Sequence, residues 1–328
     1  MISLKQLVEK TPKSWYSPMN PNDSWDLVNG KIEKFGIVNE DNRERYEPLL
    51  KGVSIFVRYV WPSVDLTTLA LGTQFSIFLR IFDDNIDTSE PEYAIKHINR
   101  VINIIKFGKL EEDPTPIERN LFDLNQNLDD RFGEKLALIN LFRNSLLDYF
   151  DNLLAWQNMK KLKGDLSMNL YYTLRRYNYA MIPSFFITLI FTMKRLKCEI
   201  ILDPLWKTIV ELSGNICAIY NDVLSYEKEM KENDERMNSF HFMKTQNNWS
   251  NQECLEFFEK EIGNCFEQLS IHEKLATQKF IPRLNKEDQE EFYQIINNLH
   301  TLIHAILSMY LTKPSYKSTN SIFVELRI

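Results

Sequence analysis

The chain has 328 residues, enough for one large domain or two small ones, and 44% hydrophobic with 26% charged residues is the composition of an ordinary globular protein. Only 9 glycines occur, and none lies in a Rossmann or P-loop pattern, which disfavours nucleotide binding through such loops. The net charge of −6 gives no indication of a nucleic-acid partner.

The predicted elements are helices almost throughout the chain. Residues 1–40 contain three prolines and are expected to form an irregular leading segment. Beyond them, apolar residues recur at three- and four-residue spacing, which is typical of amphipathic helices. This spacing predicts helices over 47–60, 66–82, 94–107, 135–160, 166–195, 203–229, 251–270 and 287–311. No alternating strand pattern or internal repeat occurs, so we expect a single all-α domain over 1–328.

The chain also carries signals about its cellular context. No run of about 18 apolar residues is present, and the charged N-terminus does not resemble a signal peptide, so we expect no membrane span. The four cysteines form no C-x-x-C pair and are expected to be free thiols. Both observations favour a soluble, cytoplasmic protein.

One proline lies inside a predicted helix. Pro183 falls within the 166–195 pattern, where it would remove a helical hydrogen bond and clash with the preceding turn. We therefore expect the helix to break or kink just before it. Such a break would expose backbone carbonyl groups near residues 178–180.

An acidic cluster follows the predicted helix 66–82. Asp83 and Asp87 are four residues apart in the sequence Asp-Asp-Asn-Ile-Asp, so a helix would place both carboxylates on one face. Their repulsion is unfavourable unless a cation lies between them, and paired carboxylates suit Mg²⁺. The alternative is a solvated helix end. An EF-hand loop is disfavoured because Thr88 occupies its glycine position.

A second polar cluster begins at Asn221. With Ser225 and Glu229 it occupies positions i, i+4 and i+8, which form one stripe on a helix. An amide oxygen, a hydroxyl and a carboxylate make a set of hard oxygen ligands for Mg²⁺. Lys228 is two turns after Asn221 and could meet an anionic group of a ligand. The alternative interpretation is an exposed polar stripe.

The two motifs, D-D-x-x-D and N-D-x-x-S-x-x-K-E, lie about 140 residues apart and together resemble those of microbial-type class I terpene synthases of bacteria, fungi and social amoebae. Further segments that resemble this family are Trp156 with Tyr171–Arg176, Met237–Phe240 and Trp249–Glu253. The resemblance spans roughly residues 50–310. It implies an all-α helical bundle around a central apolar cavity.

The resemblance also implies the metal ligands. Asp83 would be the principal ligand of the first site with Asp87 in support, and Asp84 would orient a basic partner. The remaining metal would be held by Asn221, Ser225 and Glu229, with Asp222 supporting the motif. Three Mg²⁺ ions are expected, and Mn²⁺ can replace them.

A further implied set binds the diphosphate of the substrate. The four side chains expected to contact it are Arg175, Lys228, Tyr310 and Lys313. Tyr310 and Lys313 stand where many bacterial members carry an Arg-Tyr pair. After the sensor Arg175, Asn178 would be a linker, and Tyr179 or Ala180 would supply the backbone carbonyl that helps to trigger ionisation.

The implied activity is the magnesium-dependent ionisation of a prenyl diphosphate, followed by cyclisation and deprotonation of the carbocation to a terpene. Farnesyl diphosphate is the expected substrate and would give a sesquiterpene. Geranylgeranyl and geranyl diphosphates are the alternative substrates. Phe56, Phe75 and Leu79 are the candidate cavity residues, and Trp61 is a further one. The protein is expected to be a monomer or homodimer.

Two other functions were weighed. A prenyl diphosphate chain-elongating synthase shares the architecture, but usually carries two D-D-x-x-D motifs, and the pair Asp129-Asp130 does not match one. A non-catalytic helical protein that retains the fold is disfavoured by the two intact metal-binding stripes.

Overall fold

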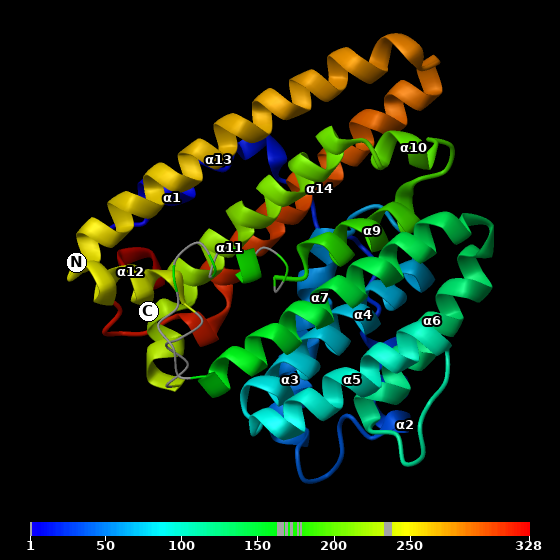
Figure 1. The fold of residues 1–328 in the computed structure, drawn as a ribbon, viewed down its shortest axis with the longest axis horizontal. Coiled ribbons are helices and arrows are strands. Elements are labelled where there is room, and N and C mark those ends of the chain that lie inside the picture. Colours follow the sequence, from blue (N-terminus) through cyan, green and yellow to red (C-terminus); the bar gives the residue numbers. More distant parts are fainter. Residues whose placement is uncertain are drawn as a thin grey trace. The chain divides into compact units, whose positions relative to one another are not determined.

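The computed structural model describes residues 2–162, 167, 170, 173–175, 177, 179–232 and 238–328. These residues form helices and one isolated bridge between Ile2 and Phe323, so the all-α fold class is confirmed (Figure 1). The chain divides into two compact units. We call Ser17–Lys194 the α4 unit, and Met1–Tyr16 with Arg195–Ile328 the α11 unit.

The α4 unit contains the helices α2 (Trp25–Phe35), α3 (Arg43–Val60), α4 (Leu66–Asp87), α5 (Pro91–Phe107), α6 (Pro116–Phe132), α7 (Leu136–Leu162) and α9 (Met181–Thr192). Helix α4 packs against α2, α3 and α6, and α7 packs against α5 and α9. Aromatic side chains connect α4 with α7. The ring of Phe82 on α4 packs edge to face against the ring of Phe150 on α7, with the centroids 5.1 Å apart. Helix α4 is therefore fixed along its length in the unit's core.

Gly72 in α4 lets the indole ring of Trp61 lie directly against the helix backbone. A Cβ atom at position 72 would lie 2.3 Å from Cζ3 of Trp61. The buried Trp61 also donates a hydrogen bond from its indole N–H to Oγ1 of Thr188 on α9, over 2.9 Å. This ring, a candidate for a cavity lining, therefore packs between α4 and α9.

Parts of the sequence prediction were wrong. The leading segment 1–40 is not irregular throughout, because α2 occupies Trp25–Phe35 and buries Trp25, Val28 and Ile32. Helix α6 was not predicted, because a proline such as Pro116 can also end a helix. Pro116 instead occupies the first turn of α6, where its missing N–H costs nothing, and Thr115 with Glu118 forms a capping box.

The α11 unit contains α1 (Lys5–Val8), α10 (Cys198–Ile201), α11 (Pro204–Glu232), α12 (Ser239–Asn247), α13 (Asn251–Phe280) and α14 (Lys286–Thr312). Helix α11 packs against α13, α14 and α12 (Figure 1). Trp206 and Tyr220 are among its fully buried side chains. None of the described helices combines the length and the apolar character needed to cross a membrane.

Candidate functional site

The first acidic motif forms the last turn of α4. Asp83 and Asp84 are half-buried there and Asp87 is exposed. The C-terminal end of a helix carries partial negative charge, so carboxylates there are stabilised by nearby cations. Asp84 forms an ion pair with Arg80, one turn earlier, with Nη2 and Oδ1 2.8 Å apart. Asp83 and Asp87 are four residues apart and share one face of the helix.

A buried tyrosine links this motif to Arg175 within the α4 unit. Burial raises the pKa of Tyr149 on α7 well above its ordinary value, and the carboxylates of Asp83 and Asp87 raise it further. The positive charge of the Arg175 guanidinium lowers the pKa of the same hydroxyl. These four side chains therefore share one electrostatic environment, in which the Tyr149 hydroxyl stays protonated and can donate a hydrogen bond.

Tyr149 was not found by sequence reasoning. It lies inside the predicted helix 135–160, in no recognised motif, and its link to Asp83 and Arg175 is made only in three dimensions. Arg175 itself is half-buried, and its guanidinium lies over the ring of Tyr179 at 5.8 Å from the centroid. The expected sensor arginine and the expected first metal motif thus belong to the same region of the α4 unit.

The predicted helix break before Pro183 is confirmed. Helix α9 begins at Met181, and its preceding residue, Ala180, has a φ of 54° in the left-handed region. The carbonyl of Ala180 accepts the first hydrogen bond of the new helix from the N–H of Ser184, over 3.1 Å. Asn178, the expected linker, lies outside the described residues.

The second motif forms a row of oxygen atoms along α11. The Ser225 hydroxyl lies 2.6 Å from the backbone oxygen of Asn221 and 2.5 Å from Oε1 of Glu229. Asn221 and Glu229 are half-buried, and Ser225 is buried. The hydroxyl of Ser225 and the carboxylate of Glu229 are therefore in direct contact, and Asn221 lies one helical turn before Ser225.

Buried residues that follow the second motif hold it in place. Asn238 donates hydrogen bonds from Nδ2 to Oε2 of Glu229, over 2.9 Å, and to the backbone oxygen of Asp222, over 2.6 Å. The Asp222 carboxylate accepts hydrogen bonds from the backbone N–H and hydroxyl of Ser239, over 3.2 and 2.6 Å. Asp222 therefore anchors the start of α12, and Asn238 orients Glu229. The role of Asn238 was not predicted.

The residues expected to grip diphosphate in the α11 unit lie close to this row. Asn221 donates a hydrogen bond from Nδ2 to the hydroxyl of Tyr310 at the end of α14. The ring of Tyr310 meets that of Tyr316 at 4.8 Å. The ammonium groups of Lys228 and Lys313 both lie over the Tyr316 ring. Tyr316 was not singled out from the sequence.

The expected cavity residues have different surroundings. Phe75 is buried and packs edge to face against Phe142 of α7 at 5.5 Å, within the core of the α4 unit. Phe56 on α3 and Leu79 on α4 are half-buried. Leu79 is one helical turn before Asp83, so the apolar face of α4 leads directly to the first acidic motif.

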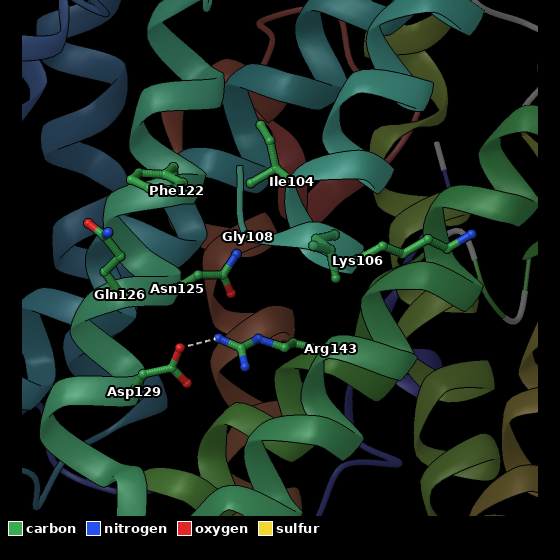
Figure 2. A pocket seen from close by; sticks show the side chains of 9 residues that line it. Ile104, Lys106, Gly108, Phe122, Asn125, Gln126, Asp129 and Arg143 are labelled. Carbon is green, nitrogen blue, oxygen red and sulfur yellow. Dashed lines mark hydrogen bonds and ion pairs between the residues drawn. The ribbon is translucent and has the colours of Figure 1, made fainter. Parts of the chain in front are cut away.

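A cavity of about 330 Å³ lies elsewhere in the α4 unit, between α5, α6 and α7. Figure 2 shows the amide of Asn125 pointing toward Arg143, which forms an ion pair with Asp129 at 2.6 Å. No residue of the two motifs lines this cavity. Asn125 lines this cavity, and both polar atoms of its buried amide lack a hydrogen-bond partner in the structure.

The donor chemistry of both motifs fits magnesium. Each supplies hard oxygen atoms, two carboxylates in α4 and an amide, a hydroxyl and a carboxylate in α11, which are the ligand types that Mg²⁺ prefers. Zinc sites in proteins are typically built from cysteine and histidine, whereas carboxylate, amide and hydroxyl oxygens are ligands of hard cations.

Comparison with known proteins identifies a family model and several proteins with similar sequences. The family model described as "Terpene synthase family 2, C-terminal metal binding" matches residues 74–268. "Terpene synthase 2" of Dictyostelium discoideum is 28% identical over 99% of this chain and 94% of its own length. "Terpene synthase 1" of Cavenderia fasciculata is 24% identical over 100% and 96%.

Solved structures show the same fold. A hedycaryol synthase in complex with HEPES aligns with a TM-score of 0.76 and 18% identity, covering 90% of this chain and 95% of its own. Germacradien-4-ol synthase from Streptomyces citricolor aligns with a TM-score of 0.73 and 17% identity, covering 92% and 97%. At these identities the similarity establishes the fold alone.

Proposed function

The chain belongs to terpene synthase family 2 and is a class I terpene synthase, a carbon–oxygen lyase acting on phosphates, and on that premise we propose that its substrate is farnesyl diphosphate. The product would be a sesquiterpene, formed by cyclisation and deprotonation with release of diphosphate. The observation that supports a metal-dependent reaction is the oxygen row of Asn221, Ser225 and Glu229, in a chain whose family is described as metal-binding.

We propose three Mg²⁺ ions as the cofactor, with Mn²⁺ able to replace them. Asp83 and Asp87 would hold metal at the end of α4, and the oxygen row of α11 would hold the remaining ion. When bound, magnesium supplies the Lewis-acid neutralisation that lets a diphosphate group leave. Membership of a family described as metal-binding supports the assignment of metal to these residues.

The chain's own side chains bind and orient the diphosphate in this proposal. Arg175 and Lys228 would meet its oxygens with charge-assisted hydrogen bonds, whose strength grows as negative charge develops on the leaving group. Tyr310 and Lys313 would add contacts in the α11 unit.

The carbocation requires a dry, apolar surface. Phe56, Phe75 and Leu79 are the proposed lining of a central cavity, supported by the apolar face of α4 that leads to Asp83. An aromatic ring face stabilises a cation by roughly 0.5–2 kcal/mol without reacting with it.

The experiment that tests this function is incubation of the purified protein with geranyl, farnesyl and geranylgeranyl diphosphates. Each reaction contains Mg²⁺, and a parallel reaction contains a chelator. Gas chromatography with mass spectrometry identifies the extracted products. We expect a hydrocarbon of fifteen carbons from farnesyl diphosphate only with metal present. Preferred use of another chain length would overturn the substrate assignment, and incorporation of isopentenyl diphosphate would indicate chain elongation.

The proposed location is the cytoplasm. All four cysteines are free thiols, and Cys217 and Cys254 are buried in the α11 unit. Free thiols are typical of proteins in a reducing compartment.

A further inference from the structure

Two residues beside the oxygen row of α11 contact other parts of the α11 unit. Tyr220 directly precedes Asn221, and Glu227 lies two positions before Glu229. Because they are seven residues apart, Tyr220 and Glu227 share one face of the helix. An α-helix turns by about 100° per residue, so this face is distinct from the face of Asn221. Neither residue is among the proposed metal ligands.

The carboxylate of Glu227 binds a segment that follows α14, residues 318–327, which we call the C segment. Oε2 of Glu227 accepts a hydrogen bond from the hydroxyl of Ser321, and Oε1 accepts one from the N–H of Ile322 over 2.9 Å. Ser321 is fully buried, and so is Phe323, whose ring packs against that of Phe240 on α12 with the centroids 6.0 Å apart. The C segment is therefore packed into the α11 unit and attached to α11 at Glu227.

The hydroxyl of Tyr220 binds a segment from the start of the sequence, residues 2–11, which we call the N segment. This hydroxyl shares a hydrogen bond of 2.6 Å with the hydroxyl of Thr11 and donates one of 3.3 Å to the backbone oxygen of Leu7 in α1. Tyr220, Thr11 and Leu7 are all buried. Buried polar groups are rarely left without partners, so these contacts attach the N segment to α11 at Tyr220.

The N segment and the C segment are joined to each other. The N–H of Ile2 donates a hydrogen bond to the carbonyl of Ile322 over 2.9 Å, and the carbonyl of Ile2 accepts one from the N–H of Val324 over 3.0 Å. The carboxylate of Glu325 accepts hydrogen bonds from the hydroxyl of Ser3, over 2.7 Å, and from the next backbone N–H, over 2.8 Å. The hydrogen bonds of Glu325 therefore join the two segments, whereas those of Glu227 join the C segment to α11.

These contacts form a closed path within the α11 unit. They connect Tyr220 to the N segment, the N segment to the C segment, and the C segment to Glu227. The rise of an α-helix is about 1.5 Å per residue, so the two attachment points on α11 lie about 10 Å apart along its axis. Two attachments on one face oppose rotation of the helix about its axis. The direction in which the oxygen row faces therefore depends on the two segments.

We propose that Glu227 is a positioning residue, through which the joined N and C segments, together with Tyr220, fix the rotation of α11 and so the direction of the oxygen row. The inference rests on the proposed function, since it takes the oxygen row to bind Mg²⁺. Glu227 and Tyr220 do not touch the metal in this proposal. They act through the backbone of α11.

The first test compares E227L, which removes both hydrogen bonds of the carboxylate, with E227Q. The glutamine keeps an acceptor for the N–H of Ile322, and its amide can donate to the hydroxyl of Ser321. The measurement is the dissociation constant of Mg²⁺ in the presence of inorganic pyrophosphate, by isothermal titration calorimetry. We expect E227L to raise this constant about ten-fold, the lower end of the range for groups that orient metal ligands, and E227Q to stay within about two-fold of the wild-type value.

The second test changes Glu325, whose hydrogen bonds join the two segments. We expect E325L to raise the Mg²⁺ dissociation constant about three-fold, because its effect reaches α11 through the N and C segments. In the double variant E227L/E325L the rise should be smaller than the product of the two single rises, because both changes interrupt the same path.

A measurement without metal checks the physical cause. Hydrogen–deuterium exchange of the metal-free protein compares the backbone amides of residues 220–229 with those of α13. In E227L and E325L this ratio of exchange rates should rise about ten-fold, and in E227Q it should stay near the wild-type value. The matched control is N285A, which removes the side-chain cap at the start of α14 and so destabilises the unit elsewhere. N285A should change neither this ratio nor the Mg²⁺ dissociation constant.

The inference is overturned by wild-type Mg²⁺ affinity in E227L, or by an equal loss in N285A, which would indicate general destabilisation. Wild-type affinity in E325L would show that the two segments do not act together. Thermal unfolding checks that each variant is folded, and S321A, which removes one hydrogen bond of Glu227, replaces E227L if that variant is not. A wild-type protein that binds no Mg²⁺ with pyrophosphate would instead refute the proposed function, and the exchange ratio would still test the role of Glu227.

Discussion

Asn238 donates a hydrogen bond of 2.9 Å to Oε2 of Glu229, and Ser225 lies 2.5 Å from the other carboxylate oxygen. Both oxygens of the last residue in the second motif are thus oriented by neighbours. Groups that orient a metal ligand from behind commonly change metal affinity by 10- to 100-fold when removed, although they do not touch the metal.

Replacement of Asn238 by alanine should therefore weaken the response to metal. We expect the Mg²⁺ concentration for half-maximal activity to rise about ten-fold in N238A. Asn238 also caps α12, so a stability loss of about 1 kcal/mol is expected and is measured by urea unfolding. N247A, an exposed asparagine of α12, is the control. An unchanged Mg²⁺ response in N238A would mean that Asn238 does not position Glu229 for metal.

The two adjacent aspartates of the first motif should differ in importance. Asp84 is engaged by Arg80, whereas Asp83 is the proposed ligand. We expect D83N to lower kcat by more than about 100-fold, because it removes charge where the leaving group is neutralised. D84N should lower it by less than about ten-fold, since it loses a partly exposed ion pair. Steady-state kinetics on both variants decides this, and the reverse order of effects would exchange the two roles.

Gly72 should not tolerate a larger side chain. In G72A the new methyl group would meet the ring of Trp61, which is fixed by its hydrogen bond to Thr188. We expect a loss of about 2 kcal/mol in the free energy of unfolding. G52A in α3, where the added Cβ meets nothing within 4 Å, should instead gain about 0.5 kcal/mol from helix propensity. Similar unfolding midpoints for the two variants in urea would contradict this interpretation.

Glu118 should make stability dependent on acidic pH. Its carboxylate is buried between α5 and α6. Burial alone would raise the pKa of Glu118, but hydrogen bonds from His97, Arg100 and the backbone of Thr115 outweigh it and lower the pKa from 4.5 to about 2. The folded state therefore favours the ionised form.

The direction in which stability changes with pH follows from proton binding to Glu118 in the folded and unfolded states. Between pH 4.5 and 2 the unfolded state binds more protons at Glu118, so stability falls as the pH falls. The full contribution, about 3 kcal/mol, is present above pH 4.5 and is lost as the pH falls through about 2. Urea unfolding should show E118Q destabilised at neutral pH and nearly equal to the wild-type protein near pH 2. E112Q, at an exposed glutamate, is the control. A constant difference across this range would contradict the assignment.

Local sequence patterns were sufficient for most of the helices and for both motifs. Spacing alone placed Asn221, Ser225 and Glu229 on one face of α11, because the period of a helix is fixed. The break before Pro183 followed from the chemistry of proline. Helix α6 was missed because the same residue type both ends helices and begins them, and only the capping box of Thr115 and Glu118 distinguishes the two cases.

The supporting residues could not be predicted from the sequence. Tyr149 and Asn238 are placed beside the motifs by tertiary packing, and no spacing rule reports such contacts. The acidic motif indicated that the charges of its carboxylates require compensation. It did not indicate that the hydroxyl of Tyr149 lies in the same electrostatic environment. The fold class is therefore readable from local chemistry, whereas the groups that surround the two motifs depend on tertiary packing.

The central claim is that the two motifs act together in one metal-dependent ionisation. The most direct test is the rate of diphosphate release from farnesyl diphosphate, at increasing Mg²⁺ concentrations, for the wild-type protein, D83N, E229Q and the double variant. We predict that each single variant loses more than about 100-fold, and that the double variant is no slower than the slower single one, because residues that serve one step are not additive. Wild-type rates of release in either D83N or E229Q would contradict the account.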